Sequence, residues 1–347
     1  MNKALSIVAV GVAALLTVTA CSSSKSAGSG ATAAGSASGG ASSAASSAAS
    51  SASGLSAPVS LKVTSLNLCN ETAELAADNG IFTKHKLNVT LVPVKSGSAG
   101  IAALQGGSTD VAFVSPQALL TAIQQGVGMQ IIADSGETTK DSQGLIVKKG
   151  SSITGAADLK GKTIAVNDLG GTAVTLIKNW ASAAGVDPAS LKFVALGFAD
   201  IEPAVVNGKV DVGAVSAADV QRIKAAGGTS IGNPTFDGVG ATPNALYAVS
   251  SSWLSSHEDV AQAFTAAMQE AADFALNPAN NTAKFATWEK YCKTPAATLA
   301  DTPQIAYTGY VNMSAMNNAV KQFKDANILK PDFDVTKYVP TWAQAHS

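Results

Sequence analysis

The sequence contains few of the residues on which catalytic and nucleic-acid-binding sites depend. Only 14% of its 347 residues are charged, 23 Lys and Arg stand against 24 Asp and Glu, and Arg222 is the single arginine. A near-balanced charge without a basic patch argues against nucleic acid as a partner. A single arginine also argues against a bidentate guanidinium clamp on a ligand carboxylate.

Histidine is equally scarce, and its positions do not combine. His85, His257 and His346 lie far apart, without the spacing of a metal site or the neighbours of a catalytic triad. No phosphate-binding loop or dinucleotide fingerprint occurs. We therefore expect no metal ion, no cofactor and no enzymatic activity.

Long hydrophobic runs are missing after the start of the chain, so no later stretch predicts a membrane span. The start has Lys3 and an apolar run over residues 4–16, which is typical of an export signal. Small residues directly before Cys21 resemble a lipobox. We interpret residues 1–20 as a signal peptide and Cys21 as a lipidated residue. A plain signal peptide with an incidental cysteine is the alternative.

The segment after Cys21 lacks apolar surface, since residues 22–57 are almost entirely Ser, Ala and Gly. Such a composition does not offset the entropy of ordering, so residues 21–57 are predicted to be a flexible tether. The tether would hold an extracytoplasmic folded part, beginning near residue 58, at the cell membrane. That part is long enough for two lobes of ordinary domain size.

Residues 89–118 contain the pattern around which the folded part is organised. A strand over 89–94 precedes a Ser/Gly loop and a helix over 98–105, and a strand over 111–114 leads into Ser115 and Pro116. Serine followed by proline is typical of a helix start. Each strand thus delivers its C-terminal end to a helix start, where ligands bind in open α/β sheets.

The same pattern returns 101 residues later without a gap. The matching residues are Gly107, Asp110, Val111, Val114 and Ser115, which align on Gly208, Asp211, Val212, Val215 and Ser216. Upstream, residues 61–67 align with 162–168, and the strand at 89 aligns with 191–195. The repeat predicts two similar α/β lobes that face each other.

Two further strands are predicted to connect the lobes. Residues 144–148 would leave the first lobe, and residues 245–250 would return beside them to form a hinge. Lobe I would then comprise residues 58–144 plus 246–347, and lobe II residues 145–245. After the return, a capping box at 255–258 predicts the start of a helix that runs to residue 276.

Two stretches of these lobes resemble a known family. GIFTKHKLNVTLVPVKSGSAGIAALQGGSTDVAFVSPQALL resembles the first lobe of ABC-transporter solute-binding proteins for nitrate, taurine, alkanesulfonates and thiamine-precursor pyrimidines, and ADLKGKTIAVNDLGGTAVTLIKNWASAAGVDP resembles their second-lobe entrance. The resemblance implies an α/β, two-lobed periplasmic-binding-protein fold of type II (Venus flytrap) with two crossover hinge strands. It also implies a small-molecule ligand between the lobes, a permease and an ATPase as partners, and a monomeric state.

Carried over residue by residue, the resemblance implies a pocket lined by the loops at the strand ends. The implied residues are Asn67, Cys69, Ser96, Gly97, Ser98, Ser115, Pro116, Asp168, Gly170, Gly171, Thr172, Phe198 and Ser216. The helix starts among them suit an anionic or strongly polar head group. Three acids near the expected cleft, Asp134, Asp168 and Asp219, are candidates to meet an amine. These features favour a small zwitterionic or polar ligand.

Several of these residues have a second interpretation. Ser115 can cap its helix instead of contacting a ligand, or do both. Gly170 and Gly171 can form only a tight turn. The aromatic rings of Phe198 and Trp253 can pack in the core instead of stacking on a ligand.

With Cys21 lipidated, Cys69 and Cys292 remain, and an even pair in an oxidising exterior favours a disulfide. Such a bond would stiffen one wall of the cleft. A free thiol at the pocket edge is the alternative.

The function that we expect is that of an extracytoplasmic solute-binding lipoprotein of an ABC importer. One alternative stays open, namely a ligand sensor that feeds a membrane signalling protein. An adhesin or structural lipoprotein is disfavoured by the paired lobes and the helix starts that face the expected cleft. The ligand class is left open among taurine, an alkanesulfonate, nitrate and a thiamine-precursor pyrimidine.

Overall fold

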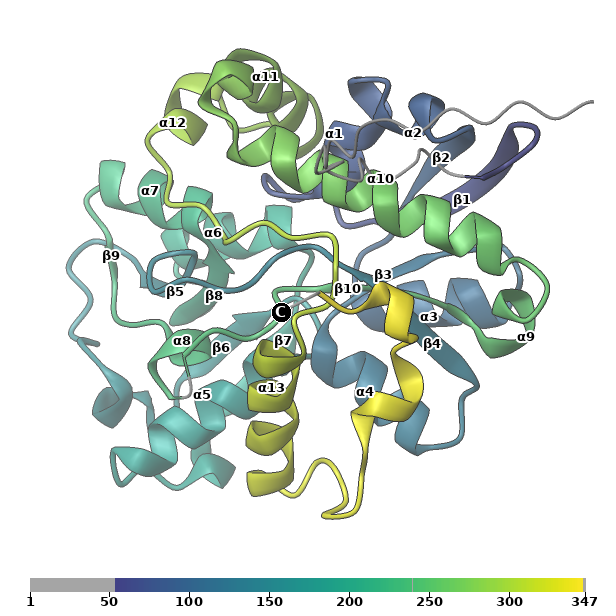
Figure 1. Ribbon diagram of the computed structural model, residues 1–347. Helices are drawn as coiled ribbons and strands as arrows, with labels where there is room; N and C mark the ends of the chain where they lie inside the picture. The colour runs from purple at the N-terminus through teal and green to yellow at the C-terminus, as the bar shows by residue number, and fades with distance from the viewer. Residues whose placement is uncertain (1–53, 239, 346–347) are drawn as a thin grey trace, which may run out of the picture. The chain divides into compact units, whose positions relative to one another are not determined.

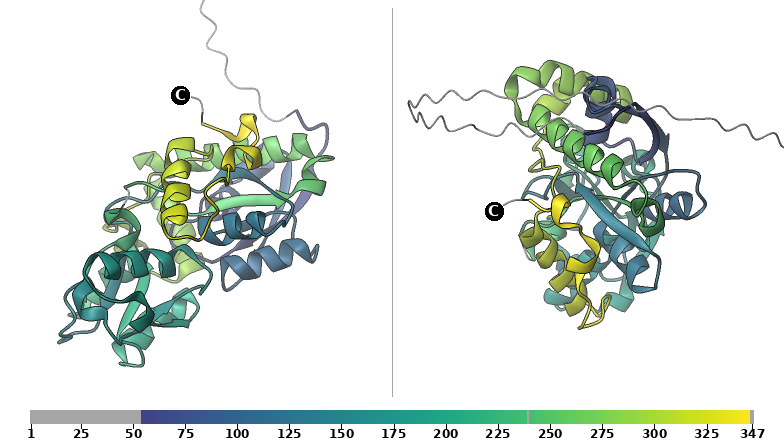
Figure 2. Two further views of the ribbon diagram at one scale, coloured as in Figure 1. Left: turned by 90° about the horizontal axis from the view of Figure 1, so that it is seen from below. Right: turned by 45° about the vertical axis from the view of Figure 1, so that its right-hand side comes forward.

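The computed structural model describes residues 54–238 and 240–345. The expected signal peptide, Cys21 and residues 21–53 of the expected tether lie outside the described residues and stay predictions. The described residues belong to one compact unit. They fold into two α/β lobes, which are shown from several directions in Figures 1 and 2.

The sheet of lobe I uses strands from both halves of the chain. Its strands are β1 (Val59–Ser65), β2 (Leu87–Pro93), β3 (Ala112–Val114), β4 (Met129–Asp134) and β10 (Leu246–Ser250). β1 pairs in parallel with β2, and β10 lies antiparallel between β3 and β4. A parallel bridge between Val63 and Val111 joins the two groups, so the order is β2-β1-β3-β10-β4.

The sheet of lobe II repeats this arrangement. Its strands are β5 (Gln143–Val147), β6 (Thr163–Val166), β7 (Lys192–Ala195), β8 (Val212–Ser216) and β9 (Thr229–Ser230), in the order β7-β6-β8-β5-β9. β6 is parallel to β7 and β8, whereas β5 is antiparallel to β8 and β9. In each lobe, the strand that enters from the other lobe therefore takes the fourth, antiparallel place.

Helices follow most of the strands. Lobe I has α1 (Thr72–Asp78), α2 (Ile81–Lys84), α3 (Gly97–Gln105) and α4 (Pro116–Gln124), and lobe II has α5 (Thr172–Ala183), α6 (Phe198–Val206), α7 (Ala217–Ala225) and α8 (Pro234–Asp237). The C-terminal part of lobe I adds α9 (Ser251–Leu254), α10 (Glu258–Leu276), α11 (Asn281–Cys292), α12 (Ala296–Ala300) and α13 (Met313–Asp325). Short 3-10 helices are Ala156–Leu159, Pro188–Ser190, Pro278–Asn280, Val335–Tyr338 and Thr341–Ala343.

The repeat predicted from the sequence is present in the hydrogen bonds of the two lobes. The carboxylate of Asp110 accepts a bond from the backbone N–H of Lys62 at 2.8 Å, and Asp211 accepts the matching bond from Thr163 at 2.8 Å. Each pair ties the first strand of its lobe to the turn before the third strand. The shared register is therefore confirmed at the level of single contacts.

The connection between the lobes differs from the expected hinge. β10 does not lie beside β5, because each joins the sheet of a different lobe. The segments that run next to each other are residues 135–138 and 242–245, which exchange backbone hydrogen bonds. Glu137 also pairs with Ala306 of the C-terminal part. Three stretches of backbone, rather than two paired strands, thus lie side by side where the chain crosses.

The start of the long helix α10 also differs from its prediction. A separate short helix, α9, precedes it, and the hydroxyl of Ser250 caps α9 by accepting a bond from the N–H of Trp253 at 3.1 Å. The cap residue of α10 is His257, whose side chain makes no capping bond. The expected capping box fails because the chain turns into α9 before it reaches residue 255.

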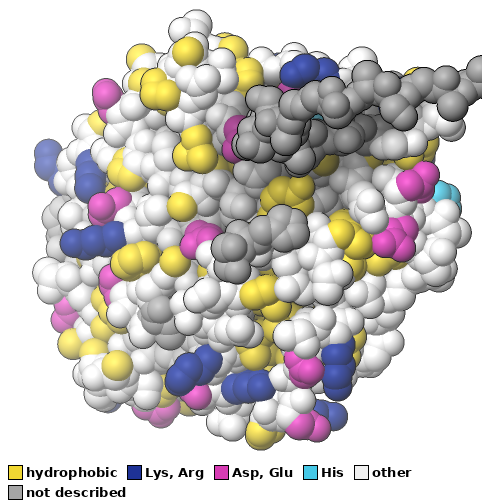
Figure 3. Space-filling view, viewed as in Figure 1, with side chains coloured by type: hydrophobic (Ala, Val, Ile, Leu, Met, Phe, Trp, Pro, Cys, Tyr) yellow, Lys and Arg dark blue, Asp and Glu magenta, His cyan; other side chains and the backbone are white. Residues whose placement is uncertain are grey.

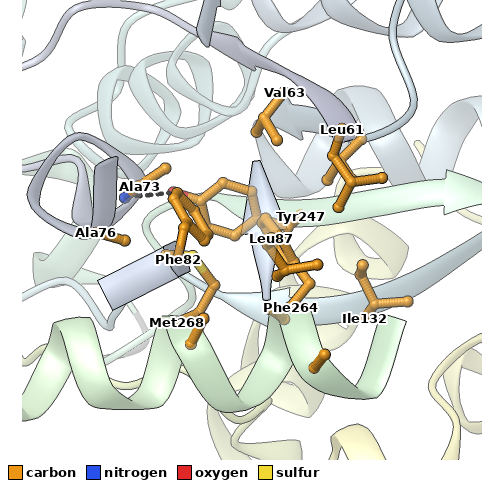
Figure 4. Packing of buried hydrophobic residues seen from close by; sticks show 14 of the residues in the cluster. Leu61, Val63, Ala73, Ala76, Phe82, Leu87, Ile132, Tyr247, Phe264 and Met268 are labelled. Atoms are coloured by element: carbon orange, nitrogen blue, oxygen red, sulfur yellow. Dashed lines mark hydrogen bonds between the residues drawn. The ribbon is translucent and has the colours of Figure 1, made fainter. Parts of the chain in front are cut away.

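One hydrophobic core of lobe I contains an aromatic cluster, and Figure 4 shows Tyr247 and Phe264 within it. Tyr247 from β10 packs against Phe113 from β3 and Phe264 from α10, with ring centroids 5.1 and 5.4 Å apart. The Tyr247 hydroxyl accepts a bond from the N–H of Ala73 in α1 at 3.3 Å. Burial raises the pKa of this hydroxyl far above its usual range. The cluster fixes α1 and α10 on the sheet and, through Phe113, supports the site described below.

Charged side chains are dispersed on the surface shown in Figure 3, where Lys and Arg alternate with Asp and Glu rather than forming a patch of one sign. Among the described residues, no helix has both the length and the apolar character needed to cross a bilayer.

Candidate ligand-binding cleft

A cavity of about 110 Å³ lies between the lobes, where strand ends from both sheets meet the crossover segments. Lobe I lines it with Leu66, Leu68, Asn70, Phe113 and Ser115, and the crossover segments add Ser142, Pro243, Asn244 and Ala245. Lobe II contributes Gln143, Gly144, Leu145, Asn167, Thr172, Ala173, Leu176, Ile177, Phe198, Ala214, Val215, Ser216, Asn233, Pro234 and Thr235. The walls are therefore mostly apolar, with amides and hydroxyls between the apolar side chains.

Several residues that the sequence placed at the site do line this cavity. Ser115 follows β3 and precedes α4, Thr172 begins α5, Phe198 begins α6, and Ser216 ends β8. All of them stand at a strand end or a helix start. Strand ends and helix starts of both lobes therefore meet at this cavity, as expected for ligand sites in α/β sheets.

The other implied residues lie outside the cavity lining. They are Asn67, Cys69, Ser96, Gly97, Ser98, Pro116, Asp134, Asp168, Gly170, Gly171 and Asp219. Ser96 caps α3 by accepting a bond from the N–H of Ala99 at 3.2 Å. Gly97 lies so close to Ser115 that a Cβ atom there would come within 3.1 Å of the Ser115 nitrogen. Both residues thus position α3 instead of facing the cavity.

Asp134 is fully buried at the end of β4, and its carboxylate accepts a bond from the N–H of Gly136 at 3.0 Å. Burial raises the pKa of this carboxyl group well above its usual range. Asp134 is not among the residues that line the cavity, so its contact with a ligand amine stays a prediction.

Asp168 forms the main contact between the lobes on the α3 side. One carboxylate oxygen, Oδ2, accepts bonds from the backbone N–H and the hydroxyl of Ser98, at 3.0 and 2.6 Å. The other oxygen, Oδ1, accepts a bond from the N–H of Gly170 at 2.9 Å. A carboxylate of lobe II therefore lies at the N-terminal end of a lobe I helix.

A second contact joins the starts of α4 and α5. The N–H of Gln117 donates to the hydroxyl oxygen of Thr172 at 3.3 Å, and the Gln117 side chain donates to the carbonyl of Gly170 at 3.2 Å. Pro116 occupies the first position of α4 and is buried. The helix starts expected to bind a ligand head group thus contact each other across the cleft.

The far side of the cleft is held by Arg222 of α7. Its guanidinium group donates to Glu202 at 2.7 Å, to Asp219, and to the hydroxyl of Thr294 in lobe I. Asp219 in turn caps α7 by accepting bonds from the N–H and hydroxyl of Ser216. Asp219, a candidate to meet a ligand amine, and the single arginine therefore both bond to groups of the protein itself.

A disulfide bond links Cys69 to Cys292, the two cysteines paired in the sequence analysis. It ties the loop after β1 to the end of α11. Thr294 lies next to it, with its hydroxyl oxygen 3.4 Å from the Cys69 sulfur. The free thiol at the pocket edge is thus excluded in this structure. The bond fixes the wall against which Arg222 of lobe II docks.

Two buried acids lie behind the lobe I wall. The carboxylate of Glu71 accepts bonds from the N–H groups of Leu66 and Leu68 at 2.8 and 3.0 Å, and Glu74 accepts a bond from the Ser65 hydroxyl. Burial raises the pKa of Glu71 to about 7 and that of Glu74 well above its usual range. Glu71 therefore holds the cavity-lining loop by its backbone.

The family profile described as "NMT1/THI5 like" matches residues 73–281. The chain belongs to this family. A sequence search of curated proteins gives no significant match for this NMT1/THI5-like protein.

Solved structures share the fold of this NMT1/THI5-like protein. The alkanesulfonate-binding protein SsuA from Xanthomonas axonopodis pv. citri, bound to MOPS, is 20% identical with a TM-score of 0.68, over 82% of this chain and 99% of that one. The periplasmic aliphatic sulphonate binding protein SsuA from Escherichia coli is 19% identical with a TM-score of 0.65, over 84% and 95%. The periplasmic nitrate-binding protein NrtA from Synechocystis PCC 6803 is 17% identical with a TM-score of 0.67, over 81% and 86%. The two-lobed fold is therefore that of periplasmic binding proteins.

The sequence analysis missed a group of side-chain amides in this NMT1/THI5-like protein. They come from Asn70, Gln143, Asn167, Asn233 and Asn244, and all of them line the cavity. Asn167 could have been predicted from the sequence, because it directly follows the strand β6 of lobe II. Gln143 and Asn244 near the crossovers could not have been predicted, since no local pattern indicates that residues 143 and 244 meet.

Proposed function

We propose that this protein is the extracytoplasmic solute-binding component of an ABC importer. It captures a small molecule in the cavity between its lobes and delivers the molecule to a membrane permease that a partner ATPase drives. The shared fold with proteins named for sulfonate and nitrate binding supports this role. Domain closure about crossover segments is a common way for two-lobed proteins to hold a ligand.

The proposal depends most on two residues that line the cavity and whose side chains each have a buried polar atom without a partner in the described part of the chain. The hydroxyl oxygen of Ser115 and the side-chain oxygen of Asn70 are buried and have no hydrogen-bond partner among the described residues. A buried polar atom without a partner costs free energy, and a ligand that supplies the missing bond recovers it. Both atoms belong to lobe I residues that line the cavity.

We propose binding without catalysis. Among the described residues that line the cavity, none has an ionisable side chain, so the lining offers no general acid, base or charged nucleophile. Within residues 54–238 and 240–345, no group of His, Cys, Asp and Glu is placed to hold a metal ion. Both observations favour a site that selects a molecule and releases it unchanged.

Import is tested in the source organism by deleting the gene and restoring it with the full chain or a variant. Cells receive a defined mixture of sulfonates, nitrate, thiamine-precursor pyrimidines and uncharged amides and alcohols, and the loss of each compound from the medium is measured. We expect one class to stay in the medium without the protein. If the deletion changes the uptake of no compound, the import role is wrong.

Matched variants on one helix localise the effect to the cavity. Ala173 lines the cavity in the first turn of α5, whereas Ala183 is exposed in the last turn. Ala173→Trp fills the cavity and is expected to fail to restore uptake, while Ala183→Trp is expected to restore it. If both variants restore uptake equally, the cavity is not the site that import requires.

We further propose that a lipid on Cys21 anchors the protein to the membrane. Replacement Cys21→Ser removes the acceptor thiol, and the neighbouring Ser22→Ala is the control. The replaced protein is expected in the soluble fraction and the control in the membrane fraction after cell lysis. An unchanged membrane association of Cys21→Ser would refute the anchor.

A further inference from the structure

The chemistry of the cavity restricts the class of molecule that it takes. Its walls carry apolar groups from both lobes, such as Leu66, Phe113, Leu176 and Phe198. Among the described residues that line it, none is Lys, Arg, His, Asp or Glu. An ion enclosed by such walls loses its hydration without gaining a charged partner, which is costly.

Helix starts are the remaining source of positive charge. One carboxylate lies both at the start of α3, outside the cavity lining, and in the turn before α5, whose first residue lines the cavity. Asp168 of lobe II accepts bonds from the N–H and the hydroxyl of Ser98. Its second oxygen accepts the N–H of Gly170 in the turn before α5. A carboxylate at these positions compensates the partial positive charge that would attract an anionic ligand.

The start of α7 is neutralised in the same way. Asp219 accepts bonds from the N–H of Ser216 at 3.3 Å and from its hydroxyl at 2.8 Å, and it also pairs with Arg222. Arg222, the single arginine of the sequence, pairs in addition with Glu202. The cation best suited to hold an anion is therefore shared between two acids and does not line the cavity.

An ionisable group that holds the lobe I wall from behind is also an acid. Glu71 is 1% exposed and holds the N–H groups of Leu66 and Leu68, both of which line the cavity. When ionised, it places a negative charge one residue layer away from a ligand. Such a charge raises the cost of binding an anion in a site of low polarity.

The cavity still offers hydrogen bonds from uncharged groups. Ser115 and Asn70 each have a buried polar atom without a partner among the described residues, and Asn167 also lines the cavity. The amides of Gln143 and Asn244, in contrast, already bond to each other at 2.7 Å. The available groups lie on both lobes, so one molecule can bridge them.

Building on the proposed function, we infer that the cleft binds an uncharged molecule with an apolar body and at least two hydrogen-bonding groups, and discriminates against sulfonates, nitrate and carboxylates. The apolar walls contact the body, and the amide and hydroxyl groups of Asn70, Ser115 and Asn167 bind its polar groups. The expected ligand of this protein therefore differs in charge from the sulfonates and nitrate for which the similar solved structures are named.

The inference is tested by native mass spectrometry of the full chain, purified and freed of small molecules by dialysis. The protein is mixed with equimolar amounts of compounds that share carbon skeletons but end in an amide, an alcohol, a sulfonate or a carboxylate, with nitrate included. A small-molecule extract of the source cells is tested in parallel. The mass of each retained compound identifies its class.

We expect uncharged compounds to be retained at least about tenfold more than anions of the same skeleton, which corresponds to roughly 1.4 kcal/mol. Ala173→Trp should lose this retention, and Ala183→Trp should keep it. Equal or greater retention of an anion overturns the inference and leaves the solute-binding role in place. Retention of no compound from either mixture overturns both. If Ala173→Trp retains as much compound as the unmodified protein, binding occurs outside the cleft, and the inference is overturned as well.

Discussion

The carboxylate of Asp168 in lobe II accepts two hydrogen bonds from Ser98 in lobe I, from its backbone N–H at 3.0 Å and from its hydroxyl at 2.6 Å. Asp168 is 8% exposed whereas Ser98 is exposed, so these bonds are partly buried. A hydrogen bond with an ionised acceptor is stronger than a neutral one. The contact therefore stabilises the arrangement in which the lobes face each other across the cavity.

Replacement of Asp168 by Asn keeps the shape of the side chain and removes its charge. We expect Asp168→Asn to weaken the closed arrangement by about 1–3 kcal/mol, since a charge-assisted pair of bonds is lost. The distance between spectroscopic labels on the two lobes should increase or become broader. Asp187→Asn is the control, because Asp187 accepts a similar bond from Ala189 within lobe II. An unchanged distance distribution in Asp168→Asn would show that Ser98 and Asp168 do not hold the lobes together.

The disulfide between Cys69 and Cys292 connects positions 223 residues apart. A cross-link that closes so long a loop restricts the unfolded chain, and its removal is expected to lower the free energy of unfolding by about 2–5 kcal/mol. The double variant Cys69→Ser/Cys292→Ser should unfold at a lower temperature than the unmodified protein. A reductant should destabilise the unmodified protein and leave the variant unaffected. Equal melting temperatures of the two proteins without reductant would contradict a stabilising role.

Much of the fold follows from local patterns that the sequence shows directly. Asp110 and Asp211 stand 101 residues apart and make the same bond to the first strand of their lobes. Strand ends followed by helix starts at Ser115 and Thr172 led to the cavity. These features are predictable because each depends on a few neighbouring residues, and because the repeat shows them twice.

The sequence does not predict the contacts that depend on distant segments. Asp168, Asp134 and Asp219 follow or begin elements at the expected cleft, yet all three bind groups of the protein itself. A sequence gives the position of a carboxylate in the chain but not the donor that it meets in space. The pairing of β10 with β3 and β4, instead of β5, is a long-range contact of the same kind.

The carboxyl group of Glu71 gives the stability of the protein a defined pH dependence. Burial raises its pKa in the folded state to about 7, above the value of 4.5 that it has in the unfolded chain. The folded state therefore binds the proton more tightly, and the free energy of unfolding should fall as pH rises between these two values. Burial raises the pKa of Glu74 and Asp134 in the same direction, so they add to the effect.

Glu71→Gln keeps an oxygen that accepts bonds from Leu66 and Leu68 but does not titrate. We expect the variant to lose less stability than the unmodified protein between about pH 5 and pH 7, by a few kcal/mol at most. Denaturant unfolding at several pH values measures the difference. The control is Glu258→Gln, which changes an exposed carboxyl group in the first turn of α10. Parallel pH profiles for Glu71→Gln and the unmodified protein would exclude Glu71 as the source.

Thr172 occupies the point where the two lobes and the cavity meet. Its hydroxyl oxygen accepts a bond from the N–H of Gln117, and the residue lines the cavity at the start of α5. Thr172→Asp would introduce a negative charge into a wall without a cation, close to the carboxylate of Asp168. The new charge should disfavour both ligand binding and the approach of the two lobes. Retention of a ligand is therefore expected to fall by at least about tenfold.

The measurement for Thr172→Asp is the retained fraction of a bound molecule in native mass spectrometry, with circular dichroism to verify folding. Thr229→Asp is the matched control, because Thr229 is exposed on the short edge strand β9 of the same lobe. The control should retain ligand as the unmodified protein does, since its new charge is solvated. Unchanged retention by a folded Thr172→Asp would show that Thr172 is not part of the binding site, because a carboxylate in a mostly apolar wall disfavours an adjacent uncharged ligand.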